Sequence, residues 1–113
     1  MKSESASINI SVTFRQTEPT EALRNYATEK LSQLLKKYVK EHTEVKVVLM
    51  VQKRDHTAEV LVHSKGYDAS SKATTEDLYS AIDKVVDTIT TQLRRQKERA
   101  ADHHRNEELP LVE

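Results

Sequence analysis

Residues 77–99 read DLYSAIDKVVDTITTQLRRQKER, and this segment decides how the rest of the chain can fold. Its apolar residues recur at spacings of three and four, which is the period of a helix with one buried stripe. They are Leu78, Ile82, Val85, Val86, Ile89 and Leu93. At about 100° per residue, a second set falls on the opposite side of the same helix. It comprises Lys84, Thr88, Thr91, Arg95 and Arg99. We therefore expect this helix to bury one face and to offer cations on the other.

Both ends of the segment carry residues that helix ends favour. Thr74 and Thr75 are candidate N-caps, and Glu76 and Asp77 would place carboxylates near the positive end of the helix dipole. Cations gather at the other end, where the dipole favours positive charge. They are Arg94, Arg95, Lys97 and Arg99. Two interpretations stay open on this segment alone: the cations bind an anionic partner, or they only cap and solvate a surface helix.

The preceding residues predict a first strand and a first helix. Apolar and polar residues alternate over residues 8–15, which is the period of a half-buried strand. Pro19 and Thr20 then suit a helix start, with Thr20 as the N-cap. The helix carries an apolar stripe from Leu23 to Tyr38 and ends near residues 40–43, where neither glycine nor proline marks the boundary.

Three further strands are expected before the second helix. In order, we predict a strand over 44–54, a polar turn over 53–56, a strand over 57–63, a tight hairpin turn at 64–66 and a weakly apolar edge strand over 67–73. The hairpin turn contains Gly66, the only glycine in the chain. Val48 and Met50 make the second side of the strand over 44–54 partly apolar, which indicates a central strand or a covered outer face.

This element order predicts an α+β fold with the sequence βαβββα. The first two strands are joined through a helix and can be parallel, whereas the tight turns make the later pairs antiparallel. The economical packing is two layers, with both helices side by side on one face of a four-stranded mixed sheet. We expect one domain over residues 1–100. From Ala101 the pattern is lost, so residues 101–113 are expected to form the helix end and a mobile acidic tail.

Charge and composition narrow the classes of function. The formal net charge is zero, with 18 basic and 18 acidic residues, so a nucleic-acid role requires cations segregated onto one face. The absence of cysteine excludes disulfides and thiolate metal sites and agrees with a cytoplasmic protein. No apolar run of about 18 residues predicts a membrane span, and no secretory signal is visible.

The residues that support catalysis or metal binding do not occur in useful patterns. The five histidines lack metal-ligand spacing, Gly66 stands alone where a phosphate loop needs several glycines, and no nucleophile–base constellation emerges. We therefore expect no enzyme, no metal, no cofactor and no small-molecule substrate.

One stretch carries a family resemblance: Asp77-Leu78-Tyr79-Ser80-Ala81-Ile82-Asp83, followed by Asp87, Gln92-Leu93 and Lys97. It resembles the signature of the ribosome hibernation-promoting factor and ribosome-associated inhibitor family, also called sigma modulation proteins. Residues 8–10, 20–24 and 45–49 support the resemblance, which covers roughly residues 8–100. It implies a short-form protein with a fold similar to double-stranded-RNA-binding domains. It also implies binding to small-subunit rRNA in the mRNA–tRNA channel, so that translation stops during slow growth, stress or stationary phase.

The resemblance and the cation pattern together nominate RNA-binding residues. They are Arg24, Lys30, Lys37, Lys84, Arg94, Arg95, Lys97 and Arg99. Thr88, Thr91 and Gln33 stand where relatives usually carry a cation, so we expect weaker binding than in more basic relatives. Tyr79 belongs to the signature, and its angle on the helix favours a place at the helix–sheet boundary over base stacking.

A different class of function stays open from sequence. The chain could be a protein-interaction module, either a homodimer or a sigma-factor modulator, that acts through the edge strand over 67–73 or through the open sheet face. We expect the isolated protein to be a monomer.

Overall fold

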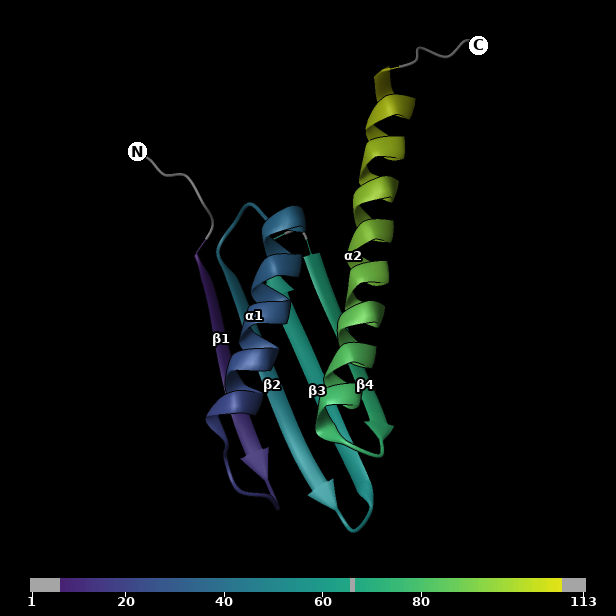
Figure 1. Ribbon diagram of the computed structural model, residues 1–113. Helices are drawn as coiled ribbons and strands as arrows, with labels where there is room; N and C mark the ends of the chain where they lie inside the picture. Colours follow the sequence, from purple (N-terminus) through teal and green to yellow (C-terminus); the bar gives the residue numbers. More distant parts are fainter. Residues whose placement is uncertain (1–6, 66, 109–113) are drawn as a thin grey trace.

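Four strands form one sheet, and two helices lie next to each other on one of its faces (Figure 1). The computed structural model describes residues 7–65 and 67–108, with the backbone alone for residue 67 and residues 100–108. The elements in chain order are β1 (Ile8–Arg15), α1 (Glu21–Tyr38), β2 (Thr43–Gln52), β3 (Asp55–Ser64), β4 (Tyr67–Thr75) and α2 (Leu78–Glu108). The predicted βαβββα order and two-layer architecture are confirmed.

The sheet has the strand order β1-β2-β3-β4. β1 is parallel to β2, and the other two pairs are antiparallel. The helix α1 provides the long crossover connection that the parallel pair of β1 and β2 requires. β2 therefore occupies the central position that Val48 and Met50 indicated, and β4 is an edge strand as predicted.

The core lies between the sheet and the two helices. Val12, Val47 and Val60 are aligned across β1, β2 and β3 on the covered face. The stripe of α2 packs against this face. Ile82, Val85, Ile89 and Leu93 of the stripe are fully buried, and so is the neighbouring Ala81. Val86, which the periodicity also assigned to the stripe, is only half-buried and faces the neighbouring helix. The burial that the helical period predicted thus determines which side of α2 packs against the sheet.

The N-terminal cap of α2 differs from the sequence prediction. Thr74 and Thr75 belong to β4, where the Thr74 and Thr57 hydroxyls lie 2.8 Å apart. Asp77 directly precedes the helix, and its Oδ1 accepts a hydrogen bond from the Ser80 backbone N–H at 2.9 Å. Strand pairing extends further than the apolar pattern of β4 suggested, so the cap moves to the next residue with a suitable side chain.

Several boundaries also differ from those predicted. The helix α1 ends at Tyr38, with its N-cap at Thr20 as expected. The turn between β2 and β3 consists of Lys53 and Arg54 alone, and Lys53 adopts a positive φ of 58°. The backbone of α2 is helical to Glu108, well past the predicted fraying at Ala101. The predicted tail residues 109–113, and the turn role of Gly66, lie outside the described residues.

Neither α1 nor the described length of α2 combines the length and the apolar character that crossing a bilayer requires.

Candidate nucleic-acid interface

The two helices run in the same direction, and α2 continues beyond the end of α1 (Figure 1). We call their solvent side, opposite the sheet, the two-helix face. At one end of the line where the helices meet, the Tyr26 and Tyr79 rings pack edge to face with centroids 5.0 Å apart. At the other end, the Lys97 amine lies 5.8 Å from the centroid of the Tyr38 ring. These contacts fix which residues of α1 and α2 share each end of the face.

The end near the start of both helices is rich in carboxylates. The Tyr26 hydroxyl donates to Asp83 Oδ1 at 2.6 Å, and the Lys30 amine lies 3.9 Å from the same oxygen. The hydrogen bond to Asp83 raises the pKa of Tyr26 above its ordinary value. The Ser80 backbone N–H, followed by the Ser80 hydroxyl, lowers the pKa of Asp77. With Asp87 one turn further along, this end offers little to a phosphate backbone.

The opposite end of the helix pair is rich in cations. Its members are Lys37, Arg94, Arg95, Lys97 and Arg99, and all five are exposed. Among the side chains that the structure describes, none of the five lies within 4.0 Å of a carboxylate oxygen. Glu98 is the single acidic residue between Thr91 and Arg99. We call these five residues the cation-rich end, because an otherwise neutral chain concentrates positive charge there.

Three predicted RNA-binding residues lie apart from the cation-rich end. Arg24 turns toward the sheet, where its Nη1 donates to the Val12 carbonyl at 3.3 Å and its guanidinium lies 5.3 Å from the centroid of the Phe14 ring. Lys30 faces Asp83. Lys84 is exposed, but Asp83 and Asp87 flank it in sequence at the carboxylate-rich end. The other five predicted residues are exposed and lie toward the C-terminal end of the helix pair, where Lys97 of α2 reaches Tyr38 of α1.

Three neighbouring threonines of α2, two of which (Thr88 and Thr91) stand where a cation was expected, bond to the backbone of their own helix. The hydroxyls of Thr88, Thr90 and Thr91 donate to the carbonyls of Lys84, Val86 and Asp87 at 3.1, 2.7 and 3.2 Å. Each hydroxyl thus uses its only proton inside the helix. These threonines cannot donate to an external phosphate unless the internal hydrogen bond breaks.

A groove of about 200 Å³ runs between the helices beside the cation-rich end. Leu34, Tyr38 and Val86 supply its apolar surfaces, and polar residues surround them. The polar residues are Lys30, Gln33, Lys37 and Thr90. The sequence did not indicate a functional role for Tyr38, Val86 or Thr90, since the groove depends on the spacing between two helices. The alignment of Lys30, Gln33 and Lys37 at helical steps was the available signal.

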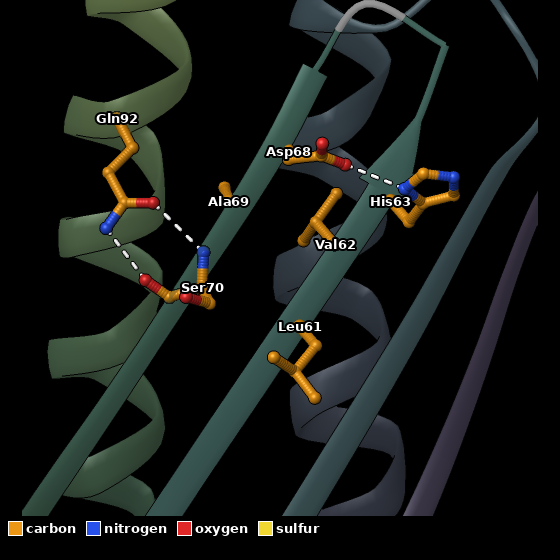
Figure 2. Close-up of a pocket in the computed structure, with 7 residues that line it drawn as sticks. All are labelled: Leu61, Val62, His63, Asp68, Ala69, Ser70 and Gln92. Atoms are coloured by element: carbon orange, nitrogen blue, oxygen red, sulfur yellow. Dashed lines mark hydrogen bonds and ion pairs between the residues drawn. The ribbon is translucent and has the colours of Figure 1, made fainter.

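The open face of the sheet has a separate hollow of about 420 Å³ near β4 (Figure 2). Leu61, which is 44% exposed, lines it together with a His63–Asp68 pair whose Nδ1 and Oδ1 atoms lie 2.7 Å apart. Gln92 and Gln96 of α2 reach over the β4 edge, and Gln96 Nε2 donates to the Asp68 carbonyl at 2.6 Å. Strand addition at this part of β4 would have to displace both amides.

Within the described part of the chain, no group of three or more histidine, aspartate or glutamate side chains is placed to hold a metal ion.

The family model for sigma 54 modulation protein / S30EA ribosomal protein matches residues 10–101. This match spans most of the chain and includes all eight nominated cations. The chain belongs to this family. Relatives in the S30EA family include the ribosome hibernation promoting factor of Escherichia coli K12, which is 33% identical over 96 residues, or 85% of this chain and 100% of the relative. The ribosome hibernation promoting factor of Azotobacter vinelandii is 30% identical over 100 residues, or 88% and 92% of the two chains.

Solved structures of similar proteins show the same fold. The N-terminal domain of Thermus thermophilus Protein Y superposes with a TM-score of 0.70 at 34% identity, covering 77% of this chain and 97% of that domain. A ribosomal subunit interface protein from Coxiella burnetii also gives a TM-score of 0.70, at 20% identity over 80% and 98% of the two chains, and supports the fold alone.

The residues that resembled the S30EA-family signature have structural roles in this chain. Asp77 caps α2, Asp83 binds Tyr26, and Gln92 binds the backbone of Ser70 on β4. Tyr79 is 42% exposed and packs on Tyr26 of α1, so its predicted place at the helix–sheet boundary was wrong. These signature residues thus cap α2 and hold it against α1 and β4.

Proposed function

We propose that this chain is a ribosome hibernation factor that binds small-subunit rRNA in the mRNA–tRNA channel and stops translation during slow growth or stress. It acts in the cytoplasm as a monomer and needs no cofactor. Membership of the S30EA family and the names of the relatives support association with the ribosome. The cation-rich end supports rRNA as the bound component.

The concentration of charge at one end carries this proposal. Lysine and arginine neutralise backbone phosphates without reading bases, which suits recognition of a structured RNA by its shape. Arg94, Arg95, Lys97 and Arg99 lie within two turns of one helix, and Lys37 approaches from the other. The carboxylate-rich end repels phosphate, so we expect the cation-rich end to meet RNA and the start of both helices to point away from it.

Co-sedimentation with purified small subunits tests the proposal. The wild-type protein should migrate with the subunits in a sucrose gradient at low salt and should be released as the KCl concentration rises. The double variant Arg95→Glu/Lys97→Glu should lose co-sedimentation. The matched control is Lys46→Glu/Lys72→Glu, which changes the net charge equally at exposed lysines on the open sheet face. Equal binding by the two double variants would contradict the proposal.

The alternative function as a strand-addition module receives less support. Gln92 and Gln96 occupy backbone groups of Ser70 and Asp68 at the β4 edge that such a module would offer to a partner. Among the described residues of the open face, Leu61 is the one large apolar side chain that is exposed, and it lies between Lys46 and Ser70 in the strand register. The open face of the sheet therefore exposes too little apolar surface for a large apolar interface.

A further inference from the structure

The groove between the helices has a chemical character that phosphate binding alone does not use. Leu34 is buried, Val86 and Tyr38 are half-buried, and together they make an apolar bed between two polar rims. A bare phosphate gains nothing from such a bed, because it would lose water there without meeting a charge. The bed suits a planar group with apolar faces.

The polar residues around the groove suit a group that also carries an anion. Lys30 and Lys37 lie seven residues apart on α1, about 10 Å along the helix axis, and both border the groove. The Lys97 amine stands over Tyr38 at the same end. Gln33 adds an exposed amide that can donate and accept, and the Thr90 hydroxyl can still accept, since its proton bonds to the Val86 carbonyl.

We propose that this groove receives one unpaired nucleobase of a single-stranded RNA segment, with a flanking phosphate held by Lys37. This inference rests on the proposed function and specifies part of the RNA that the two-helix face binds. The volume of about 200 Å³ lies below the range of about 300–1,000 Å³ that suits drug-sized ligands. It fits a single ring system. Unpaired bases are the part of RNA that stacks on aromatic side chains, whereas bases in a duplex stay inside the helix.

A pair of threonine substitutions tests the groove separately from the surrounding charge. Thr90→Phe fills the groove without changing net charge. Thr88→Phe is the matched control, because Thr88 is exposed outside the groove and its hydroxyl makes the same bond to the carbonyl four residues earlier. Thr90→Phe should weaken binding to small subunits by about tenfold, the scale of one lost base stack, with an unchanged salt slope. Thr88→Phe should weaken binding much less, because Thr88 does not line the groove. Equal affinities for the two variants would overturn the inference and leave the proposed function intact.

A second measurement uses the wild-type protein alone. Methyl resonances of Leu34 and Val86 should shift when a short single-stranded RNA is added, and should stay in place with inorganic phosphate or an RNA duplex. If they stay in place with all three probes while resonances of the cation-rich end move, the groove holds no base. If the wild-type protein fails to bind small subunits at all, the proposed function fails. These methyl shifts then still decide whether the groove takes a base.

Discussion

Gln92 holds the backbone of Ser70 with both ends of its side-chain amide: Oε1 accepts from the Ser70 N–H at 3.0 Å, and Nε2 donates to the Ser70 carbonyl at 2.7 Å (Figure 2). Both backbone groups face away from β3, so the strand that pairs with β4 does not satisfy them. The helix that carries the cation-rich end is thereby fastened to the outermost strand of the sheet, and Gln96 adds a third bond at Asp68.

Loss of this clamp should destabilise the fold. Gln92→Glu removes the donor and places a carboxylate beside the Ser70 carbonyl, so the free energy of unfolding should fall by about 1–2 kcal/mol. Urea denaturation measures this change. Gln33→Glu is the control, because Gln33 is an exposed glutamine on α1 and its substitution should cost less than about 0.5 kcal/mol. Equal urea midpoints for the two variants would show that the clamp contributes nothing.

The Tyr26–Asp83 hydrogen bond should give stability a specific dependence on alkaline pH. Tyr26 keeps its proton more tightly in the folded protein, since its pKa is raised there chiefly by the bond to Asp83. The stability that this bond adds is therefore full below the unfolded pKa of about 10, and it is lost as the pH rises through the folded pKa.

The variant Tyr26→Phe isolates that dependence. At neutral pH it should be about 1 kcal/mol less stable than the wild type, and the difference should shrink above about pH 10. Urea midpoints measured at several pH values for both proteins provide the test. A constant difference across the alkaline range would argue against the bond as its source.

Arg24 and Arg95 should separate stability from RNA binding. Arg24→Ala breaks a hydrogen bond to the Val12 carbonyl and a contact with the Phe14 ring, so it should cost about 1 kcal/mol of stability and leave the salt slope of ribosome binding unchanged. Arg95→Ala should do the reverse, lowering the slope by about 0.7–0.9 with little change in the urea midpoint. A reduced slope for Arg24→Ala would return Arg24 to the RNA-binding surface.

Cations introduced at Thr88 and Thr91 should strengthen binding. Both side chains lie on the solvent side of α2, and their hydroxyls serve only the helix backbone. Thr88→Lys/Thr91→Lys should raise the salt slope by about 0.7–0.9 for each phosphate that a new lysine reaches. Thr13→Lys is the control, because Thr13 is exposed on the open sheet face, and it should leave the slope as in the wild type. An unchanged slope in the double variant would place this part of α2 away from the RNA.

Periodicity predicted the fold because the spacing of the apolar residues identifies the buried side of each element. Alternation over β1 and the three-and-four spacing of α2 each identify the side that packs, and one buried face for each element leaves few ways to assemble them. The N-cap was misplaced because Thr75 and Asp77 are equally good capping residues, and only the register of β4 against β3 shows that Thr75 is already part of a strand. Register is a long-range property that local patterns do not contain.

The candidate site was predicted less completely than the fold. Helical angles identify which residues share a face, and this placed Arg95 and Arg99 correctly on the solvent side. They do not show where a long side chain turns, so the contact of Arg24 with a strand carbonyl was not predicted. The groove requires Tyr38 of one helix and Val86 of the other to lie at a particular separation. Only the assembled helices reveal it.

The hydrogen bonds at the two outer strands have a consequence for the behaviour of the folded chain at high concentration. The Thr43 N–H bonds to the Ser7 carbonyl, and alternate residues of a parallel strand bond the same neighbour, so the Val12 carbonyl that Arg24 binds points outward. Arg24 at the β1 edge and Gln92 at the β4 edge therefore occupy backbone groups that could otherwise pair with a strand of another molecule. Such pairing would extend the sheet from one molecule to the next. We therefore expect the same helices that present the positive charge to oppose fibril formation as well.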